Sequence, residues 1–201
     1  MAFYGGTADM KLSAVILAGG ESKRMGRDKA SLQVNGYSLL SLAVEKVRQL
    51  GITEVFISGR AGKDYFPLNC PVLVDLEPGC GPLSGIERGL HASSSTLLLV
   101  LAVDLPHINT AFLRKLITQC DASTGVVPKV DGLFETLVAI YPKRCHIIAS
   151  DLLARSRRAV REFAEKCLEQ NAVRTMCVTQ SDVGCFANWN TPTDITPSDG
   201  T

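Results

Sequence analysis

Residues 14–29 read AVILAGGESKRMGRDK, and this stretch decides the class of fold that we expect. Its first part, AVILA, is a short apolar run with β-branched residues, which is typical of a strand buried on both faces. The pair Gly19 and Gly20 closes this run, and a polar segment with Arg and Lys side chains follows. The stretch therefore predicts a buried strand whose carboxyl end opens directly into a glycine-rich loop.

Apolar runs and segments of helical periodicity alternate along the rest of the chain. The pattern predicts strands at 55–57, 72–74, 97–103, 126–127, 137–141 and 173–178, and helices at 39–50, 83–90, 112–117 and 160–168. The run LLLVLAV at 97–103 does not alternate with polar residues, so both faces of that strand should be covered. Alternating strands and helices predict an α/β fold, a three-layer, doubly wound and mostly parallel sheet. Sites in such sheets lie at the carboxyl ends of the strands.

The composition indicates a globular protein. We expect one domain over residues 1–201, with an ordered core from about residue 12 to residue 194. Lys and Arg number 21 against 20 Asp and Glu, a balance that argues against a broad basic surface for nucleic acid. The N-terminus does not resemble a secretory signal, and the longest apolar run is too short to cross a bilayer. We therefore expect a cytoplasmic protein with no membrane partner. Its seven scattered cysteines include no CxxC pair, so they suggest neither a disulfide framework nor a zinc site.

The loop after the first strand carries groups that suit a triphosphate. Glycines let the backbone approach a ligand and present N–H groups to an anion. Arg24 can hold phosphate oxygens in a fork, and Lys29 adds a compact positive charge. The spacing fits neither the P-loop pattern GxxxxGK[ST] nor GxGxxG, which disfavours a nicotinamide-dependent dehydrogenase. The alternative is a sharp turn with solvated charges.

Asp104 directly follows the strand at 97–103, and Pro106 marks the point where the chain leaves the sheet. A carboxylate in this position can hold Mg²⁺ against phosphates, because Mg²⁺ needs only one or two protein carboxylates. The alternative is that Asp104 caps the next helix, although Asn109 or Thr110 is better placed for a cap.

The segment LAGGESKRMGRDK at 17–29 resembles the opening motif of the molybdenum cofactor guanylyltransferases, the MobA-like branch of the nucleotidyltransferases. The resemblance continues through GPLSG at 81–85, DLP at 104–106 and FANWNTP at 186–192. It implies a Rossmann-like nucleotidyltransferase fold and the transfer of GMP from GTP to the phosphate of molybdopterin. It further implies Mg²⁺ as cofactor, held by Asp104, and a handover complex with the enzymes that insert molybdenum.

The resemblance also gives roles to individual residues. Catalysis would depend on Arg24, Lys29 and Asp104. The nucleotide would be bound by the glycine loop and by residues at neighbouring strand ends, namely Leu17, Ala18, Gly19, Gly20, Lys29, Ser58, Asp75, Gly85 and Asp104. Asn188 and Asn190 would lie on the acceptor side, where their amides can pair with the pterin edge. Taken alone, the pattern NxNTP favours a turn.

Alternatives stay open for several of these assignments. Asp75 could instead begin a loop and accept hydrogen bonds from nearby backbone N–H groups. Ser58 stands where some relatives have Asn. The basic run at 155–161 suits a solvated helix face with ion pairs, or a contact of Arg157 or Arg158 with the acceptor phosphate. For the whole protein, the alternatives are a sister nucleotidyltransferase that uses CTP or a sugar or alcohol phosphate, and a non-catalytic nucleotide-binding protein.

Overall fold

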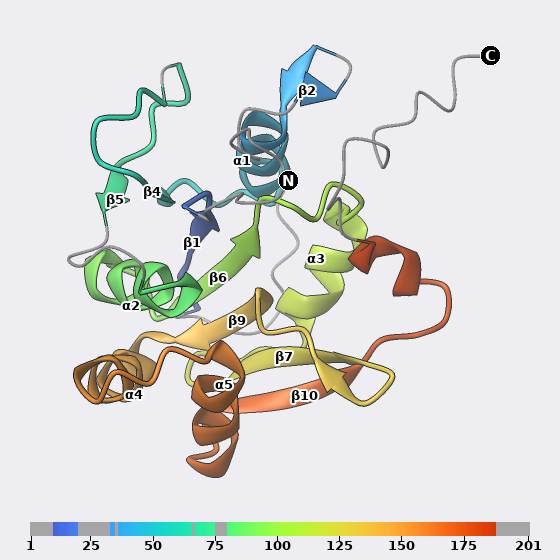
Figure 1. Cartoon of the computed structure of the whole chain (residues 1–201). Helices are drawn as coiled ribbons and strands as arrows, with labels where there is room; N and C mark the ends of the chain where they lie inside the picture. Colours follow the sequence, from blue (N-terminus) through green and yellow to red (C-terminus); the bar gives the residue numbers. More distant parts are fainter. Residues whose placement is uncertain (1–9, 20–32, 35, 66, 75–79, 188–201) are drawn as a thin grey trace.

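The computed structural model describes residues 10–19, 33–34, 36–65, 67–74 and 80–187 (Figure 1). The main sheet consists of β1 (Leu12–Leu17), β4 (Val55–Gly59), β5 (Val72–Val74), β6 (Leu97–Ala102), β7 (Gly125–Val130), β8 (Leu133–Phe134), β9 (Val138–Pro142) and β10 (Val173–Cys177). A short hairpin joins β2 (Gln33–Val34) to β3 (Tyr37–Ser38). The helices are α1 (Leu39–Arg48), α2 (Pro82–Ala92), α3 (Thr110–Thr118), α4 (His146–Ala154) and α5 (Val160–Glu169), with 3₁₀ turns η2 (Lys143–Cys145) and η3 (Val183–Phe186).

The strand order in the main sheet is β10-β7-β9-β6-β1-β4-β5, with β8 paired to β7. β1 is parallel to both of its neighbours, β4 and β6, whereas β9 is antiparallel to both β6 and β7. The chain first runs outward from β1 to β4 and β5, and then returns past β1 to form β6. The strand order therefore reverses between β1 and β6, which is where ligands bind in doubly wound sheets. The predicted fold class is confirmed.

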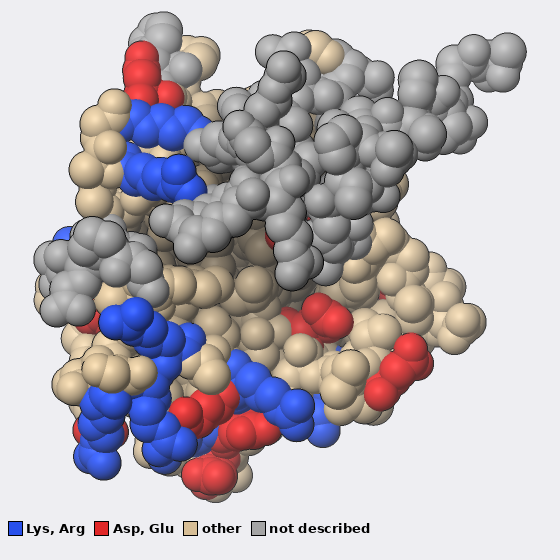
Figure 2. Space-filling view, viewed as in Figure 1, with Lys and Arg blue, Asp and Glu red and all other residues tan. Residues whose placement is uncertain are grey.

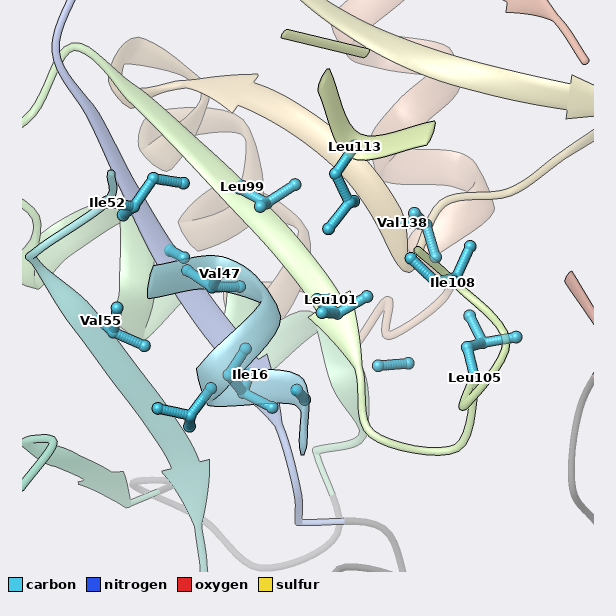
Figure 3. Packing of buried hydrophobic residues seen from close by; sticks show 14 of the residues in the cluster. Ile16, Val47, Ile52, Val55, Leu99, Leu101, Leu105, Ile108, Leu113 and Val138 are labelled. Atoms are coloured by element: carbon cyan, nitrogen blue, oxygen red, sulfur yellow. The ribbon is translucent and has the colours of Figure 1, made fainter. Parts of the chain in front are cut away.

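Helices α1 and α3 cover one face of the sheet. Ile16 of β1 and Leu101 of β6 lie in one buried cluster with Val47 of α1 and Leu113 of α3 (Figure 3). Because helices cover both faces of the central strands, their side chains are buried in both directions, and β6 is buried along its whole length. This burial explains why the apolar run at 97–103 does not alternate.

Helices α2, α4 and α5 pack on the opposite face. Val15 of β1 and Leu98 of β6 contact the second buried cluster, which holds Leu83 of α2, Leu152 of α4 and Phe163 of α5. α4 was not predicted from the sequence. Its apolar residues occur on several sides of the helix, so no helical period stands out in the residue pattern.

Local capping fixes where two of the helices begin. The Ser38 hydroxyl accepts a hydrogen bond from the backbone N–H of Ser41 at 3.0 Å, and the Asn109 side chain accepts one from Phe112 at 2.9 Å. These bonds satisfy N–H groups that the first turn of a helix leaves unpaired. The cap of α3 is thus Asn109, one of the two residues predicted, and not Asp104.

All seven cysteines are free thiols. Among the residues that the structure describes, no group of three or more His, Cys, Asp or Glu side chains could hold a metal ion. In the same part of the chain, none of the helices has the length and apolar character that a bilayer crossing requires.

Candidate functional site

The end of β1 lies between the ends of β4 and β6. In the sheet register Leu17 pairs with Ser58 on one side and with Ala102 on the other. Beyond the strand, the N–H of Ala18 donates to the Ser58 carbonyl at 2.9 Å, and the N–H of Val103 donates to the Leu17 carbonyl at 3.2 Å. The chain therefore leaves β1 and β6 side by side, which brings the start of the glycine loop close to the segment that carries Asp104.

Helix α2 approaches the same strand ends at Gly85. A Cβ atom added at Gly85 would lie 2.3 Å from Ser58 Oγ and 2.8 Å from Leu17 Cδ2. These distances are well inside van der Waals contact, so only glycine allows the helix to pack this closely. At Gly19, by comparison, an added Cβ would meet the Ser58 carbonyl oxygen at 3.7 Å, an ordinary contact. The structure thus brings together the predicted nucleotide-binding residues at the ends of β1 and β4 and on α2.

The segment after Asp104 is anchored on both sides. Leu105 and Ile108 are buried in the core beneath it (Figure 3). The Lys46 ammonium of α1 donates to the Pro106 carbonyl at 2.6 Å, and burial lowers the pKa of this lysine. Asp104 itself is partly buried at the carboxyl end of β6. The contact of Lys46 could not be predicted from the sequence, because a lysine on an amphipathic helix ordinarily faces solvent.

Comparison with known proteins decides the family. Residues 14–173 match the model of the MobA-like NTP transferase domain. The chain belongs to this family. A relative from Opitutus terrae, named "Probable molybdenum cofactor guanylyltransferase", is 34% identical over 186 residues, covering 91% of this chain and 92% of the relative. A relative of the same name from Mycobacterium marinum is 35% identical over 195 residues, with 92% of each chain covered.

Solved structures agree with the MobA-like fold. The molybdopterin-guanine dinucleotide biosynthesis protein A from Archaeoglobus fulgidus superposes with a TM-score of 0.71 at 23% identity, covering 91% of this chain and 94% of the other. The 2-C-methyl-D-erythritol 4-phosphate cytidylyltransferase from Thermus thermophilus gives a TM-score of 0.69 at 19% identity, covering 92% and 96%. At these identities the likeness shows the nucleotidyltransferase fold.

Part of the predicted MobA-like site lies outside the described residues. This applies to the glycine loop from Gly20 onward, to the residue that follows the 72–74 strand and to the FANWNTP ending beyond Ala187. The residues concerned are Gly20, Arg24, Lys29, Asp75, Asn188 and Asn190. Their roles stay predictions.

The basic run at 155–161 forms ion pairs on the surface around α4 and α5. Arg155 pairs with Asp151 at 2.9 Å and Arg161 with Glu165 at 2.9 Å, while Arg157 pairs with Glu162 at 2.6 Å. Lys and Arg side chains are accordingly mixed with Asp and Glu over this part of the surface (Figure 2). The arrangement matches the expected solvated helix face, and a contact with the acceptor phosphate stays a prediction.

Proposed function

We propose that this MobA-like protein transfers GMP from GTP to the terminal phosphate of molybdopterin, or of its molybdenum-loaded form, and releases pyrophosphate. The relatives that are 34% and 35% identical carry the name of this activity. The observation that carries the proposal is the hydrogen bond from the Val103 N–H to the Leu17 carbonyl at 3.2 Å. It holds the start of the glycine loop beside the segment of Asp104, so a triphosphate on the loop has a carboxylate next to it.

The chemistry is an in-line displacement at the α-phosphorus of GTP. An oxygen of the acceptor phosphate forms the new P–O bond, and the bond to the bridging oxygen of the β-phosphate breaks. The second pKa of a phosphate monoester is about 6, so the attacking group is already ionised at neutral pH and needs no general base. Catalysis then consists of positioning the two substrates and neutralising their charge.

The residues at this edge of the sheet fit a bound Mg²⁺. This ion takes one or two protein carboxylates and leaves its other positions to phosphates and water, so Asp104 at the end of β6 is a sufficient anchor. Bound there, the ion would neutralise charge on the α-phosphate. Arg24 and Lys29 would hold the β- and γ-phosphates, together with the N–H groups of the glycine loop.

The nucleotide would lie between the glycine loop and α2. The helix begins at Pro82, directly after Gly81, which has a φ of +72°, and no side chain caps its first turn. Proline has no N–H, and the N–H of Ser84 donates to the Gly81 carbonyl at 3.3 Å, so the N–H of Leu83 is the first-turn donor that would face a ligand. Asn188 and Asn190 would then bind the pterin of the acceptor. Handover of this acceptor from the enzymes that insert molybdenum is part of the same proposal.

Isothermal titration of GTP, CTP, ATP and UTP, each with Mg²⁺, tests the proposal in wild type and in Asp104→Ala. We expect selective binding of GTP that weakens in the variant, and pyrophosphate release when molybdopterin is added. Preference for CTP would assign the protein to a sister activity of the same fold. Binding of none of the four nucleotides would show that the glycine loop is structural and would refute the proposal.

A further inference from the structure

The segment 133–137, between β8 and β9, lies at the same edge of the sheet as Asp104. β9 is antiparallel to β6, so the chain enters β9 at the carboxyl end of β6, where the N–H of Ala102 donates to the Leu137 carbonyl at 2.9 Å. β9 borders β6 on the side away from β1. Glu135 therefore lies across β6 from the glycine loop. With the nucleotide between the glycine loop and α2, as proposed above, the acceptor would approach from this side of β6.

Hydrogen bonds hold the backbone around Glu135 in place. The N–H of Glu135 donates to the Pro128 carbonyl at 2.9 Å, and its carbonyl accepts from Val138 at 3.3 Å. The next carbonyl, of Thr136, accepts from the Tyr141 hydroxyl at 3.0 Å. The Glu135 side chain is half-buried, yet within the described part of the chain no hydrogen bond or ion pair engages its carboxylate.

This arrangement is unfavourable without a ligand. Burial raises the pKa of the Glu135 carboxyl, because the charged form loses water and no donor from the described part of the chain replaces it. Polar atoms that folding removes from water normally have hydrogen-bond partners. The carboxylate therefore indicates a site for a ligand that brings its own N–H donors.

The residue before Glu135, Phe134, is held by the core and by the β7–β8 hairpin. Phe134 is partly buried against the α2, α4 and α5 cluster and pairs with Lys129 across the β7–β8 hairpin. The Lys129 ammonium lies 4.4 Å from the centre of the Phe134 ring. The Phe134 ring is thus engaged by the core and by Lys129, and the carboxylate of Glu135 is the group that this segment offers to a ligand.

We propose that Glu135 recognises the pterin of the acceptor by accepting hydrogen bonds from its ring N3–H and its 2-amino group. These two donors lie side by side on one edge of the pterin, and a carboxylate accepts such a pair with its two oxygens. Glu135 is then a specificity-determining residue for the acceptor. The inference rests on the function proposed above, since it identifies the group that would distinguish a pterin from another phosphorylated acceptor.

Two free pteridines provide the probes for a binding test with the full chain. Pterin carries the 2-amino group, whereas lumazine carries a carbonyl there and lacks that donor. Fluorescence titration should give tighter binding of pterin than of lumazine by wild type. Glu135→Gln should weaken pterin binding roughly tenfold to a hundredfold and remove the preference, since a bond to a charged acceptor is lost. Glu45→Gln, which changes an exposed glutamate on α1, should leave both affinities unchanged.

Steady-state kinetics with molybdopterin give the second readout. Glu135→Gln should raise KM for molybdopterin and leave the affinity for Mg²⁺ and GTP unchanged. Its melting temperature should not fall, because the substitution removes a charge that is partly withdrawn from water. Unchanged pterin binding in this variant, or no saturable pterin binding by wild type, would overturn the inference. Weaker binding of Mg²⁺ and GTP would also overturn it, because the carboxylate would then belong to the nucleotide side. Failure of the proposed function would be seen in a separate experiment: in calorimetry, wild type would not bind GTP more tightly than CTP, ATP and UTP.

Discussion

Replacing Gly85 by alanine should push helix α2 away from the strand ends that form the candidate nucleotide site. The new Cβ would lie 2.3 Å from Ser58 Oγ, 2.9 Å from Ser58 Cβ and 2.8 Å from Leu17 Cδ2. Normal contacts between such atoms begin near 3.5 Å, so the first turn of α2 must move by about 1 Å. Rotation of the Ser58 hydroxyl cannot relieve the clash, because the Ser58 Cβ is also too close.

The change should affect ligand binding more than stability. Overpacking of this kind costs about 1–3 kcal/mol, and the higher helix propensity of alanine offsets about 1 kcal/mol of that. We therefore expect a loss of about 0–2 kcal/mol in the free energy of unfolding, measured by urea denaturation. Displacement of a substrate-binding element by about 1 Å can reduce the rate by about a hundredfold. Guanylyl transfer and GTP titration measure that loss.

Two further variants separate the causes. Gly89→Ala places a Cβ 3.0 Å from Leu98 and 3.1 Å from Val15, in the same helix but about 6 Å further along its axis. It should lower stability and leave GTP affinity near wild type. Adding Ser58→Gly to Gly85→Ala removes two of the three clashes and should recover much of the lost affinity. A single Gly85→Ala variant with wild-type stability and GTP affinity would refute the reasoning.

Three other perturbations give distinct outcomes. Asp104→Ala or Lys29→Ala should each lower the transfer rate by about two orders of magnitude or more, and wild-type turnover in either would contradict the assignment. Lys46→Met should leave the Pro106 carbonyl without its donor and lower the unfolding free energy by about 1 kcal/mol, which a thermal melt can detect against Glu45→Gln. For Asp121, hydrogen bonds from the N–H groups of Ser123 and Thr124 hold the pKa at about 2 in the folded state, against an ordinary value of 3.8. The stabilisation by this carboxylate is therefore present above pH 4 and is lost as the pH falls towards 2, so urea denaturation of wild type and Asp121→Asn should give converging stabilities over that interval.

The central strands and the protein family could be predicted from the sequence, because both depend on short local patterns of residues. An apolar run that does not alternate with polar residues indicates a strand covered on both faces, and β1 and β6 were predicted on this basis. Asn109 was predicted as the better cap of α3 than Asp104 because capping depends on a side chain and the N–H groups of the following turn. The opening motif at 17–29 indicated a nucleotidyltransferase, the FANWNTP ending at 186–192 indicated the MobA-like branch, and the match to the MobA-like model confirmed this family.

Helix α4 and the direction of β9 could not be predicted in the same way. In α4 the exposed Ile147 lies beside the buried Ile148, so the residue pattern does not reveal which side faces the core. The direction of a strand depends on the end of the sheet at which the preceding connection enters it. The residue types within β9 do not determine this. Both features depend on contacts between distant segments.

The sequence alone determined the separate segments of the candidate site. A glycine loop that follows one buried strand and an aspartate that follows another buried strand are both local patterns. Only the tertiary structure decided which pieces meet. It placed β1 between β4 and β6, so Leu17 lies next to Ser58, and Asp104 follows the neighbouring strand. It also placed Glu135 beside the carboxyl end of β6, on the side away from β1, because β9 runs antiparallel to β6. The physical reason is that sheet order is set by packing helices on both faces of a shared core, and that packing brings together residues far apart in the chain.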